Sequence, residues 1–414
     1  MARLQPVRGT HDLFGAEALA HLHVVEQARE AARRFGYAPA ATPVFEFTEV
    51  FARTLGETSD IVTKEMYTFT DKGGDSLTLR PEGTAGVARA IISGGLANEL
   101  PLKLFYAGPM FRHERPQKGR LRQFHQIGVE LVGVPEPSGD VEVVALGAEV
   151  LARLGVRAAT TLEINTLGDG ESRAAYRTAL VGYLLDHTSR LSADSRERLE
   201  RNPLRILDSK DESDRAVVAG APSFADYLTP AARDFFAAVR DGLGALGIEH
   251  TVNPRLVRGL DYYCHTAFEF TTAALGAQGT VLAGGRYDGL IETMGGPATP
   301  GVGWAAGIER LAMLVGDVPR PPRAIAVLPL GPAAERQALL LAAELRAQGH
   351  AVDLAYRSGL KRGLRRADRV GARIAVLLGA DELARGEATV RDLDTGEQAG
   401  VPLAGLAAYL LRFR

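Results

Sequence analysis

A proline-rich segment at residues 316–323 divides the chain into two parts that must fold around separate cores. Its sequence, GDVPRPPR, holds three prolines within four positions. Proline lacks the amide hydrogen that a helix needs and disfavours helical geometry in the residue before it, so the helical pattern has to end there. With 414 residues, the chain is long enough for two or three domains. We therefore expect one domain over residues 1–320 and another over residues 323–414.

The second part alternates short apolar runs with stretches of helical apolar spacing. We expect strands at residues 324–330, 351–355 and 373–378, helices at 333–348 and 359–370, then a hairpin and a short helix at 403–411. Strands that alternate with amphipathic helices form parallel sheets covered by helices. The second domain should thus be a small α/β domain with a largely parallel sheet.

The first part has a different pattern. An early helix is predicted at residues 15–35, and closely spaced strand candidates separated by Gly, Pro and Asp follow it. Hairpins of this kind indicate a mostly antiparallel sheet. Residues of about 171–250 interrupt the pattern with helical spacing around a polar middle, which we interpret as a helical insertion. Strand signals then return, and a final helix is predicted at residues 304–315.

Composition excludes several classes of protein. The one cysteine, Cys264, cannot form an intramolecular disulfide, the N-terminus lacks the apolar core of a signal peptide, and polar or glycine residues interrupt every apolar run. We expect a cytoplasmic protein that does not cross a membrane. The net charge is −2, yet residues 323–414 carry 14 basic against 10 acidic side chains. This asymmetry weakly favours a polyanionic partner for the second domain.

Residues 103–133 carry the most informative pattern, KLFYAGPMFRHERPQKGRLRQFHQIGVELVG. Two strand-like arms flank a polar loop, which predicts a long hairpin. Because side chains alternate between the faces of a strand, the polar positions fall on one face of each arm. These positions are Arg112 and Glu114 on the first arm, and Phe124, Gln126, Gly128 and Glu130 on the second. We interpret this face as a ligand-binding surface, with Gly128 leaving room for a flat ligand; an idle, solvated hairpin is the alternative.

Four further segments place polar residues or glycines where a core strand would carry Val and Ile. In LRPEGTAG, Glu82 and Thr84 could meet a ligand amine or begin a helix. The pair Tyr262 and Tyr263 could line a site or belong to the core. The glycines of LAGGRYDGL would let the backbone approach a ligand or only form a turn. Arg310, after GVGWAAG, could reach a phosphate or lie in a surface ion pair.

Together these segments resemble a known family. FRHERPQKGRLRQFHQIGVE is similar to motif 2 of the class II aminoacyl-tRNA synthetases, and GVGWAAGIERL is similar to their motif 3. RGLDYY and LAGGRYDGL resemble the two histidine-specific signatures of the histidyl-tRNA synthetases. RGTHDL, RPEGTA, INTLG, NPLRILDSKD and the C-terminal GEATVRDLDTGEQ also resemble that family. The resemblance covers nearly the whole chain in the right order.

The resemblance implies an α+β catalytic domain on a mostly antiparallel sheet with a helical insertion, and a C-terminal α/β anticodon-binding domain. It implies activation of L-histidine by ATP and Mg²⁺ to histidyl-adenylate, followed by transfer to the 3′ end of tRNA(His). It also implies a homodimer formed through motif 1, at the early helix and the following strand at residues 42–47.

Site residues are carried over position by position. The resemblance implies that the catalytic residues are Arg112, Arg258 and Arg310. It implies that the histidine-binding residues are Glu82, Thr84, Gln126, Glu130, Arg258, Tyr262, Tyr263 and Tyr287. It implies that ATP is bound by Arg112, Glu114, Arg120, Phe124 and Arg310. For tRNA it implies Arg115, Gln117 and Lys118 at the motif 2 tip, and we add Arg362, Arg366 and Arg369 in the second domain because acids are nearly absent around them.

The charge run of the second domain has a plain alternative, a solvated helix face with Leu360, Leu364 and Val370 on its buried side. Two rival functions also remain. One is the regulatory subunit of ATP phosphoribosyltransferase, which keeps the synthetase core but lacks the anticodon-binding domain and loses catalytic arginines. The other is a class II synthetase for glycine, proline or threonine. We assign no metal to protein side chains, since the adjacent Cys264 and His265 point to opposite faces of a strand.

Overall fold

The computed structural model divides the chain into two compact units, Met1–Val318 and Pro319–Arg414. It describes residues 3–56, 61–209, 211–257, 262–356 and 359–413. Each unit has its own sheet and its own core of buried side chains. Among the described residues, no helix is both long and apolar enough to span a bilayer.

The N-terminal unit is built on an eight-stranded sheet. From one edge to the other, the strands are β1 (Ala38–Pro39), β5 (Leu102–Phe111), β6 (Gln123–Val132), β11 (Gly301–Gly307), β10 (Thr280–Arg286), β9 (Cys264–Thr271), β7 (Thr161–Thr166) and β8 (Thr251–Val252). Only the outermost pairs, β1 with β5 and β7 with β8, are parallel. The prediction of a mostly antiparallel sheet is therefore confirmed, and β5 and β6 form the long hairpin expected around residues 103–133.

Alternation along β6 separates the core from the opposite face of the sheet. Ile127, Val129 and Leu131 belong to the main hydrophobic cluster. Helices α1 (Gly15–Arg34), α4 (Pro137–Arg153) and α8 (Pro230–Ala245) contribute to the same cluster and cover this face. The alternating positions, which include Gln126 and Glu130, belong to the other face, as the period-2 count predicted.

The other face of the sheet is only partly covered. Helices α3 (Thr84–Ser93) and α9 (Leu290–Thr293) pack there with Tyr106 and Met110 of β5. Beside them lie α2 (Thr48–Leu55) and a three-stranded sheet of β2 (Phe45–Phe47), β4 (Ser76–Leu79) and β3 (Tyr67–Thr70). These elements border the remaining part of the face and leave room there for a site.

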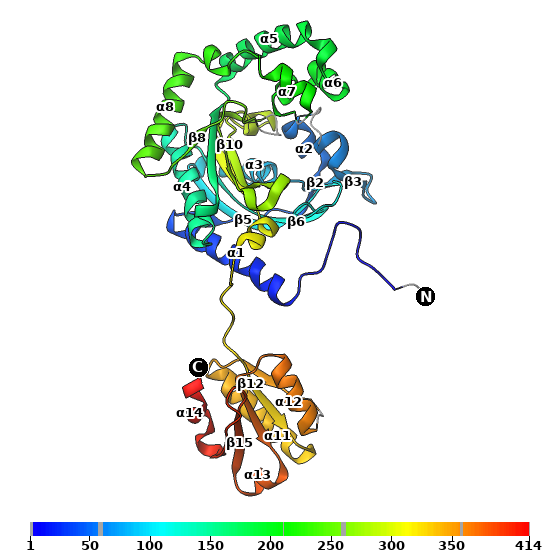
Figure 1. The fold of residues 1–414 in the computed structure, drawn as a ribbon, viewed down its shortest axis with the longest axis vertical. Coiled ribbons are helices and arrows are strands. Elements are labelled where there is room, and N and C mark those ends of the chain that lie inside the picture. Colours follow the sequence, from blue (N-terminus) through cyan, green and yellow to red (C-terminus); the bar gives the residue numbers. More distant parts are fainter. Residues whose placement is uncertain (1–2, 57–60, 210, 258–261, 357–358, 414) are drawn as a thin grey trace. The chain divides into compact units, whose positions relative to one another are not determined.

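The insertion is a helical cluster with its own small core. Helices α5 (Gly170–Asp186), α6 (Ala193–Arg201) and α7 (Glu212–Val218) lie together at one end of the N-terminal unit (Figure 1). Their apolar side chains, including Tyr176, Leu180 and Val217, pack on one another. Helix α8 differs from the expectation: its Val239 and Leu243 are buried in the main core. Periodicity marked α8 as a helix but carried no information about which core it joins.

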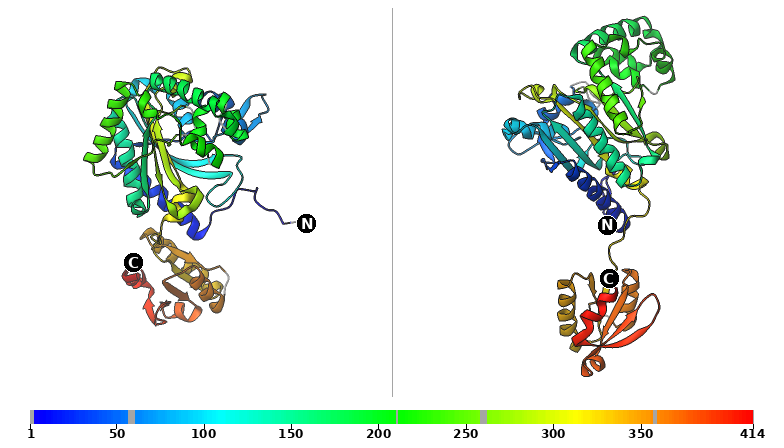
Figure 2. Two further views of the ribbon diagram at one scale, coloured as in Figure 1. Left: turned by 45° about the horizontal axis from the view of Figure 1, so that its top comes forward. Right: turned by 90° about the vertical axis from the view of Figure 1, so that its left-hand side faces the viewer.

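The C-terminal unit holds a five-stranded sheet, in the order β13 (Val352–Leu354), β12 (Ile325–Pro329), β14 (Ile374–Leu378), β15 (Glu387–Asp392) and β16 (Gln398–Pro402). Helix α11 (Pro332–Ala347) packs on one face together with α14 (Leu406–Leu410), and α12 (Leu360–Arg369) packs on the other (Figure 2). A short α13 (Ala380–Ala384) precedes β15. The first three strands are parallel and the hairpin adds two antiparallel strands, so the sheet is more mixed than expected.

One expected helix is shorter than predicted. Residues 301–307 form β11, and α10 (Ile308–Leu314) begins only after it. Trp304 stands in the middle of the sheet, paired with Val129 on one side and Gly284 on the other. Pairing with two neighbouring strands outweighs the helical spacing of the apolar residues in this segment.

Candidate active site

A cavity of about 210 Å³ lies on the partly covered face of the large sheet. The first turn of α3, strands β6, β10 and β11, and the start of α10 supply its walls. Ten residues predicted from the sequence line it: Glu82, Thr84, Arg112, Glu114, Arg120, Phe124, Gln126, Tyr262, Tyr263 and Arg310. Segments up to 228 positions apart in the chain are thereby brought to one site, as positions 82 and 310 show. Arg258 lies outside the described residues.

Arginines dominate one end of the cavity. The Arg112 Nε donates to the carbonyl oxygen of Pro81 at 2.9 Å, and its guanidinium carbon lies 5.2 Å from the ring centre of Phe124. Arg310 donates to the carbonyl oxygens of Gly119 and Thr280, at 3.1 and 2.7 Å. Main-chain acceptors thus help to orient both guanidinium groups.

Burial lowers the pKa of Arg310, and the positive charges of Arg120 and Arg112 lower it further. Like charges that are held close together in this way are costly unless an anion joins them. The arginine end of the cavity is therefore suited to a polyanion such as a polyphosphate, for which guanidinium groups are well-matched donors.

Glu114 lies among these arginines. Its side chain is 8% exposed and forms an ion pair with Arg120, and its nearer carboxylate oxygen lies 3.9 Å from Arg112 Nη1. In this arrangement the carboxylate bonds to Arg120, a partner that the sequence interpretation did not foresee. A ligand that recruited Glu114 would have to compete with that ion pair.

The opposite end of the site is built around the buried carboxylate of Glu130. Three hydroxyl groups donate to it: Thr84 Oγ1 at 2.8 Å, Tyr106 at 3.1 Å and Tyr287 at 2.6 Å. Burial raises the pKa of Glu130 to about 8, although the hydroxyl groups act in the opposite direction. Glu130 and Tyr287 therefore belong to one network, which lies behind the cavity wall, and Tyr106 is a member that the sequence analysis missed.

Glycines make room for this network. A Cβ at Gly303 would lie 1.9 Å from a carboxylate oxygen of Glu130, and one at Gly128 would lie 2.4 Å from the hydroxyl oxygen of Tyr106. We expected Gly128 to let a flat ligand approach the strand. Instead, Tyr106 of the same protein occupies that space, because it stands opposite Gly128 on the neighbouring strand β5.

Glu82 and Thr84 fit both of the interpretations that the sequence left open, a helix start and part of a ligand site. The Glu82 carboxylate accepts from the backbone N–H groups of Thr84 and Ala85, at 2.7 and 2.8 Å, and so caps the first turn of α3. Burial raises its pKa. Both side chains also line the cavity, so the helix start is itself part of the site.

Gln126 presents the clearest unsatisfied group of the cavity. Its Oε1 atom is buried and has no hydrogen-bond partner within the part of the chain that the structure describes. A buried amide oxygen without a partner is costly, and a ligand N–H would remove that cost. Nearby, the rings of Tyr262 and Tyr263 lie 4.6 Å apart, and Tyr262 also contacts Tyr287 at 5.9 Å between ring centres.

None of the residues expected to meet RNA is among those that line the cavity. Arg115, Gln117 and Lys118 are exposed at the hairpin tip, where Gln117 pairs with Arg120 in a short β-bridge. On α12, Arg362 and Arg369 are exposed, but Arg366 forms a two-point ion pair with Asp353, at 2.7 and 2.9 Å. The structure thus commits Arg366 to an ion pair within the protein.

The buried side of α12 agrees with the expectation only at Leu364, which packs against the sheet. Gly363 and Ala367 are the buried residues, whereas Leu360 and Val370 are each 44% exposed. The helix approaches the sheet through its smallest side chains. Apolar residues at its two ends were therefore poor markers of the packed face.

A buried ion pair behind the sheet was also missed. Arg286, in the GGRYDG segment, has a fully buried side chain that pairs with Asp140 of α4 and donates to Asp288 at 3.0 Å. Asp288 in turn accepts from the backbone N–H of Gly301 at 3.2 Å. The pair joins α4 to the turn that positions Tyr287. In the sequence, the pair could have been suspected from the charged residues Arg286 and Asp288 on the two sides of Tyr287.

Comparisons with known proteins agree with this geometry. The family model described as histidyl-tRNA synthetase matches residues 9–311, and the anticodon-binding domain model matches residues 324–413. The histidine–tRNA ligase of Rhodospirillum rubrum is 64% identical over 414 residues, and that of Gluconacetobacter diazotrophicus is 59% identical over 410; at least 99% of each chain is covered. The crystal structure of apo histidyl-tRNA synthetase from S. aureus superposes with a TM-score of 0.82 at 34% identity, covering 98% of this chain and 99% of that one. This chain therefore belongs to the histidyl-tRNA synthetase family.

Proposed function

We propose that this chain is a histidine–tRNA ligase. It would join L-histidine to ATP as histidyl-adenylate, release pyrophosphate, and pass the histidyl group to the 3′ end of tRNA(His). The observation that carries the proposal is the cavity, which brings three arginines together with a buried, unsatisfied amide oxygen and, through Thr84, with the hydroxyl network around Glu130. Close similarity to histidine–tRNA ligases along the whole chain supports the same function.

The first reaction needs alignment and charge stabilisation. A carboxylate oxygen of histidine attacks the α-phosphorus of ATP, the bond to the bridging oxygen breaks, and pyrophosphate leaves with its electrons. No proton moves in this step, so no protein base is required. Arg112 and Arg310 would stabilise the negative charge on the phosphates, because their guanidinium groups are already oriented by backbone carbonyls. We assign Arg258 to the same step, by family resemblance alone.

The adenine ring would lie between Phe124 and Arg310. Both side chains line the cavity, and Arg112 already lies over the ring of Phe124. Aromatic and guanidinium faces stack well on a flat base. Glu114 would accept from the adenine amino group, and Arg120 would then turn from Glu114 toward the phosphates.

Mg²⁺ would enter with ATP. Magnesium prefers oxygen ligands and keeps several waters, so it is commonly bound through substrate phosphates and one or two carboxylates. Of the carboxylates that line the cavity, Glu82 caps α3, Glu114 pairs with Arg120 and Glu309 bonds to His125. The phosphates themselves would therefore supply most of the ligands for the ion.

Histidine would bind at the hydroxyl end. Its ammonium group would donate to Gln126 Oε1, with Glu82 and Thr84 nearby. Its imidazole would meet Tyr263 and the network of Tyr287 and Glu130. Because Glu130 lies behind the wall, we assign it the role of a positioning residue that orients hydroxyl groups. An apolar side chain of similar size would leave these groups unpaired, which accounts for roughly 10⁴-fold discrimination.

RNA binding is proposed at two surfaces. Exposed Arg115, Gln117 and Lys118 would meet the acceptor end, and exposed Arg362 and Arg369 would meet the phosphate backbone in the anticodon region. Arg366 is proposed only as a support for α12, because Asp353 holds it.

A homodimer is proposed at the motif 1 region. Phe45 and Phe47 of β2 and Phe69 of β3 are 49%, 53% and 45% exposed. Large apolar side chains grouped on one small sheet are typical of a protein interface. Gel filtration at micromolar concentration should give a dimer, and a monomer would contradict the assignment. The protein would act in the cytoplasm.

Aminoacylation of matched tRNA(His) transcripts, with each of the twenty amino acids and with or without the extra 5′ guanylate, tests the function. We expect ATP-dependent charging with histidine only. Preference for glycine, proline or threonine would indicate a sister synthetase. Absence of histidine-dependent pyrophosphate exchange would favour a regulatory subunit of ATP phosphoribosyltransferase, an alternative that the match to an anticodon-binding domain and the presence of Arg112 and Arg310 disfavour.

A further inference from the structure

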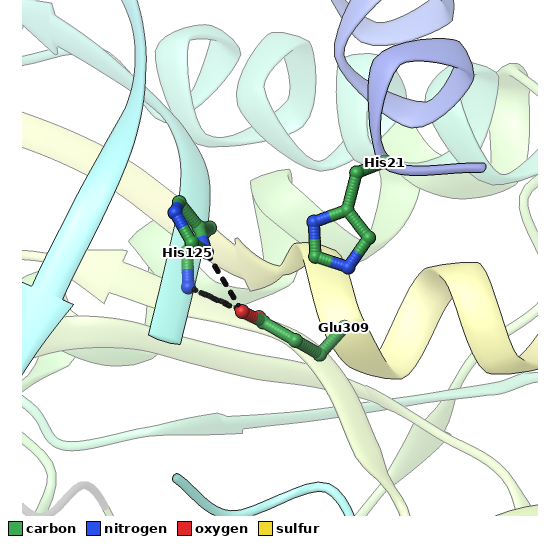
Figure 3. Close-up of side chains that lie close together, drawn as sticks. All are labelled: His21, His125 and Glu309. Atoms are coloured by element: carbon green, nitrogen blue, oxygen red, sulfur yellow. Dashed lines mark hydrogen bonds and ion pairs between the residues drawn. The ribbon is translucent and has the colours of Figure 1, made fainter. Parts of the chain in front are cut away.

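Three side chains with metal-ligating atoms meet beside the cavity, and the proposed reaction gives none of them a role. They are His21 of α1, His125 of β6 and Glu309 at the start of α10. Figure 3 shows the imidazole of His21 beside the His125–Glu309 pair. One ligand atom from each residue lies within 4.8 Å of the other two, and all three residues are half-buried.

His125 holds Glu309 firmly in place. The Nδ1 atom of His125 lies 2.8 Å from Glu309 Oε1, and its backbone N–H donates to both carboxylate oxygens, at 2.9 and 3.0 Å. Burial acts to raise the pKa of Glu309, but the hydrogen bonds from His125 outweigh it and lower the pKa. These hydrogen bonds hold the carboxylate in one orientation.

His21 completes the set from a separate element. Its ring meets that of His125 edge-on, with 5.8 Å between ring centres. Burial lowers the pKa of His21, and the nearby His125 and His11 add to this effect while Glu309 opposes it. The ring is thus placed to supply a third ligand atom beside the His125–Glu309 pair.

Two imidazole nitrogens and one carboxylate oxygen are the donor set of many zinc sites with one open position. Such ligands also suit Co²⁺ and Ni²⁺, whereas Mg²⁺ and Ca²⁺ prefer oxygen ligands alone. Ligand atoms around a tetrahedral zinc ion lie about 3.3 Å apart. The distance between His125 Nδ1 and Glu309 Oε1, now 2.8 Å, would increase slightly as the ion replaces the proton of their hydrogen bond. A side-chain rotation that moves the ligand nitrogen of His21 by roughly 1.5 Å or less would bring it to the spacing of zinc ligands.

We propose that His21, His125 and Glu309 bind one divalent transition-metal ion, preferably Zn²⁺, with a water molecule as the fourth ligand. The ion would join α1 to the motif 2 strand and to the motif 3 helix that carries Arg310. It is distinct from the Mg²⁺ that accompanies ATP, because the donor set contains two imidazoles and, although Glu309 also lines the cavity, neither histidine does.

Cobalt binding to the full chain, without ATP or tRNA, tests this site. Titration with Co²⁺ at pH 7.5 should give visible absorption that saturates at about one ion per chain, and Zn²⁺ should abolish it, because zinc binds such sites more tightly than cobalt. The variant His21→Gln should bind Co²⁺ at least about tenfold more weakly. The matched control is His23→Gln, which changes a half-buried histidine of the same helix outside the cluster and should bind like the unchanged chain.

Loss of binding in His21→Gln but not in His23→Gln supports the site. A second variant, His125→Gln, must show the same loss, and circular dichroism must show that each variant is folded. Unchanged affinity in either ligand variant that is folded overturns the proposal. Absence of saturable absorption in the unchanged chain overturns it equally, and neither result bears on aminoacylation.

Discussion

The two ends of the cavity hold their polar groups in different ways. At the arginine end, Arg112 and Arg310 donate to main-chain carbonyls that orient their guanidinium groups. At the other end, the charge of Glu130 is suppressed by burial, and hydroxyl groups surround it. Phosphates need strong preoriented charge, whereas recognition of a small polar ring needs matched hydrogen bonds. The difference suggests that one end serves the reaction and the other selectivity.

The largest effect should follow from a change at the arginine end. Arg310→Ala should lower kcat/KM for histidine-dependent pyrophosphate exchange by about 10²–10³-fold, because a preoriented donor to the phosphates is lost. The matched control is Arg385→Ala, which removes an exposed arginine paired with Glu387 at 3.5 Å and should change little. A similar loss in both variants would mean that the cavity location of Arg310 is not what matters.

A change at the hydroxyl end should act on selectivity more than on rate. Tyr287→Phe removes the hydroxyl that donates to Glu130 at 2.6 Å. We expect the KM for histidine to rise by roughly tenfold, with a smaller change in kcat and none in the KM for ATP. Steady-state exchange with each substrate varied in turn measures this. A rise confined to the KM for ATP would reverse the assignment of the two ends.

The pKa of Glu130 predicts a pH dependence of stability. Its folded pKa is raised to about 8 from 4.5, so the group ionises more readily in the unfolded chain. Its contribution favours the folded state fully below pH 4.5 and is lost as the pH rises toward 8. Glu130→Gln should remove this pH dependence of the free energy of unfolding, which amounts to a few kcal/mol in total. Urea unfolding of both forms between pH 5 and 8 measures it, and parallel curves would show that Glu130 does not titrate in that range.

The smallest effects should come from α12. Arg362→Ala and Arg369→Ala should each weaken tRNA binding a few-fold. Each should also reduce the slope of log affinity against log salt concentration by about one, the contribution of one phosphate contact. Arg366→Ala should instead lower the stability of the C-terminal unit slightly, with less effect on binding, because Asp353 already holds that side chain. Filter binding at several salt concentrations, together with thermal unfolding, separates the two outcomes.

Much of this molecule follows from local pattern. Prolines at 319–322 end one unit, alternation along residues 123–132 separates a core face from a polar face, and the ordered motifs indicate the family. Each of these features is set by residues that lie close together in the sequence. Periodicity and backbone stereochemistry are therefore sufficient to predict it. The motifs also named ten residues that line one cavity, although only the fold brings those distant segments together.

Only the tertiary structure decided which groups meet across long separations. The sequence could not show that Tyr106 fills the space at Gly128, that Arg366 turns to Asp353, or that α8 joins the main core. Each depends on strand register or helix packing between distant segments, where side-chain size and the need to pair buried polar groups select one arrangement. The meeting of His21, His125 and Glu309, which are up to 288 positions apart, has the same origin. Spacing along the chain predicts which residues share a face, and packing determines which residues touch.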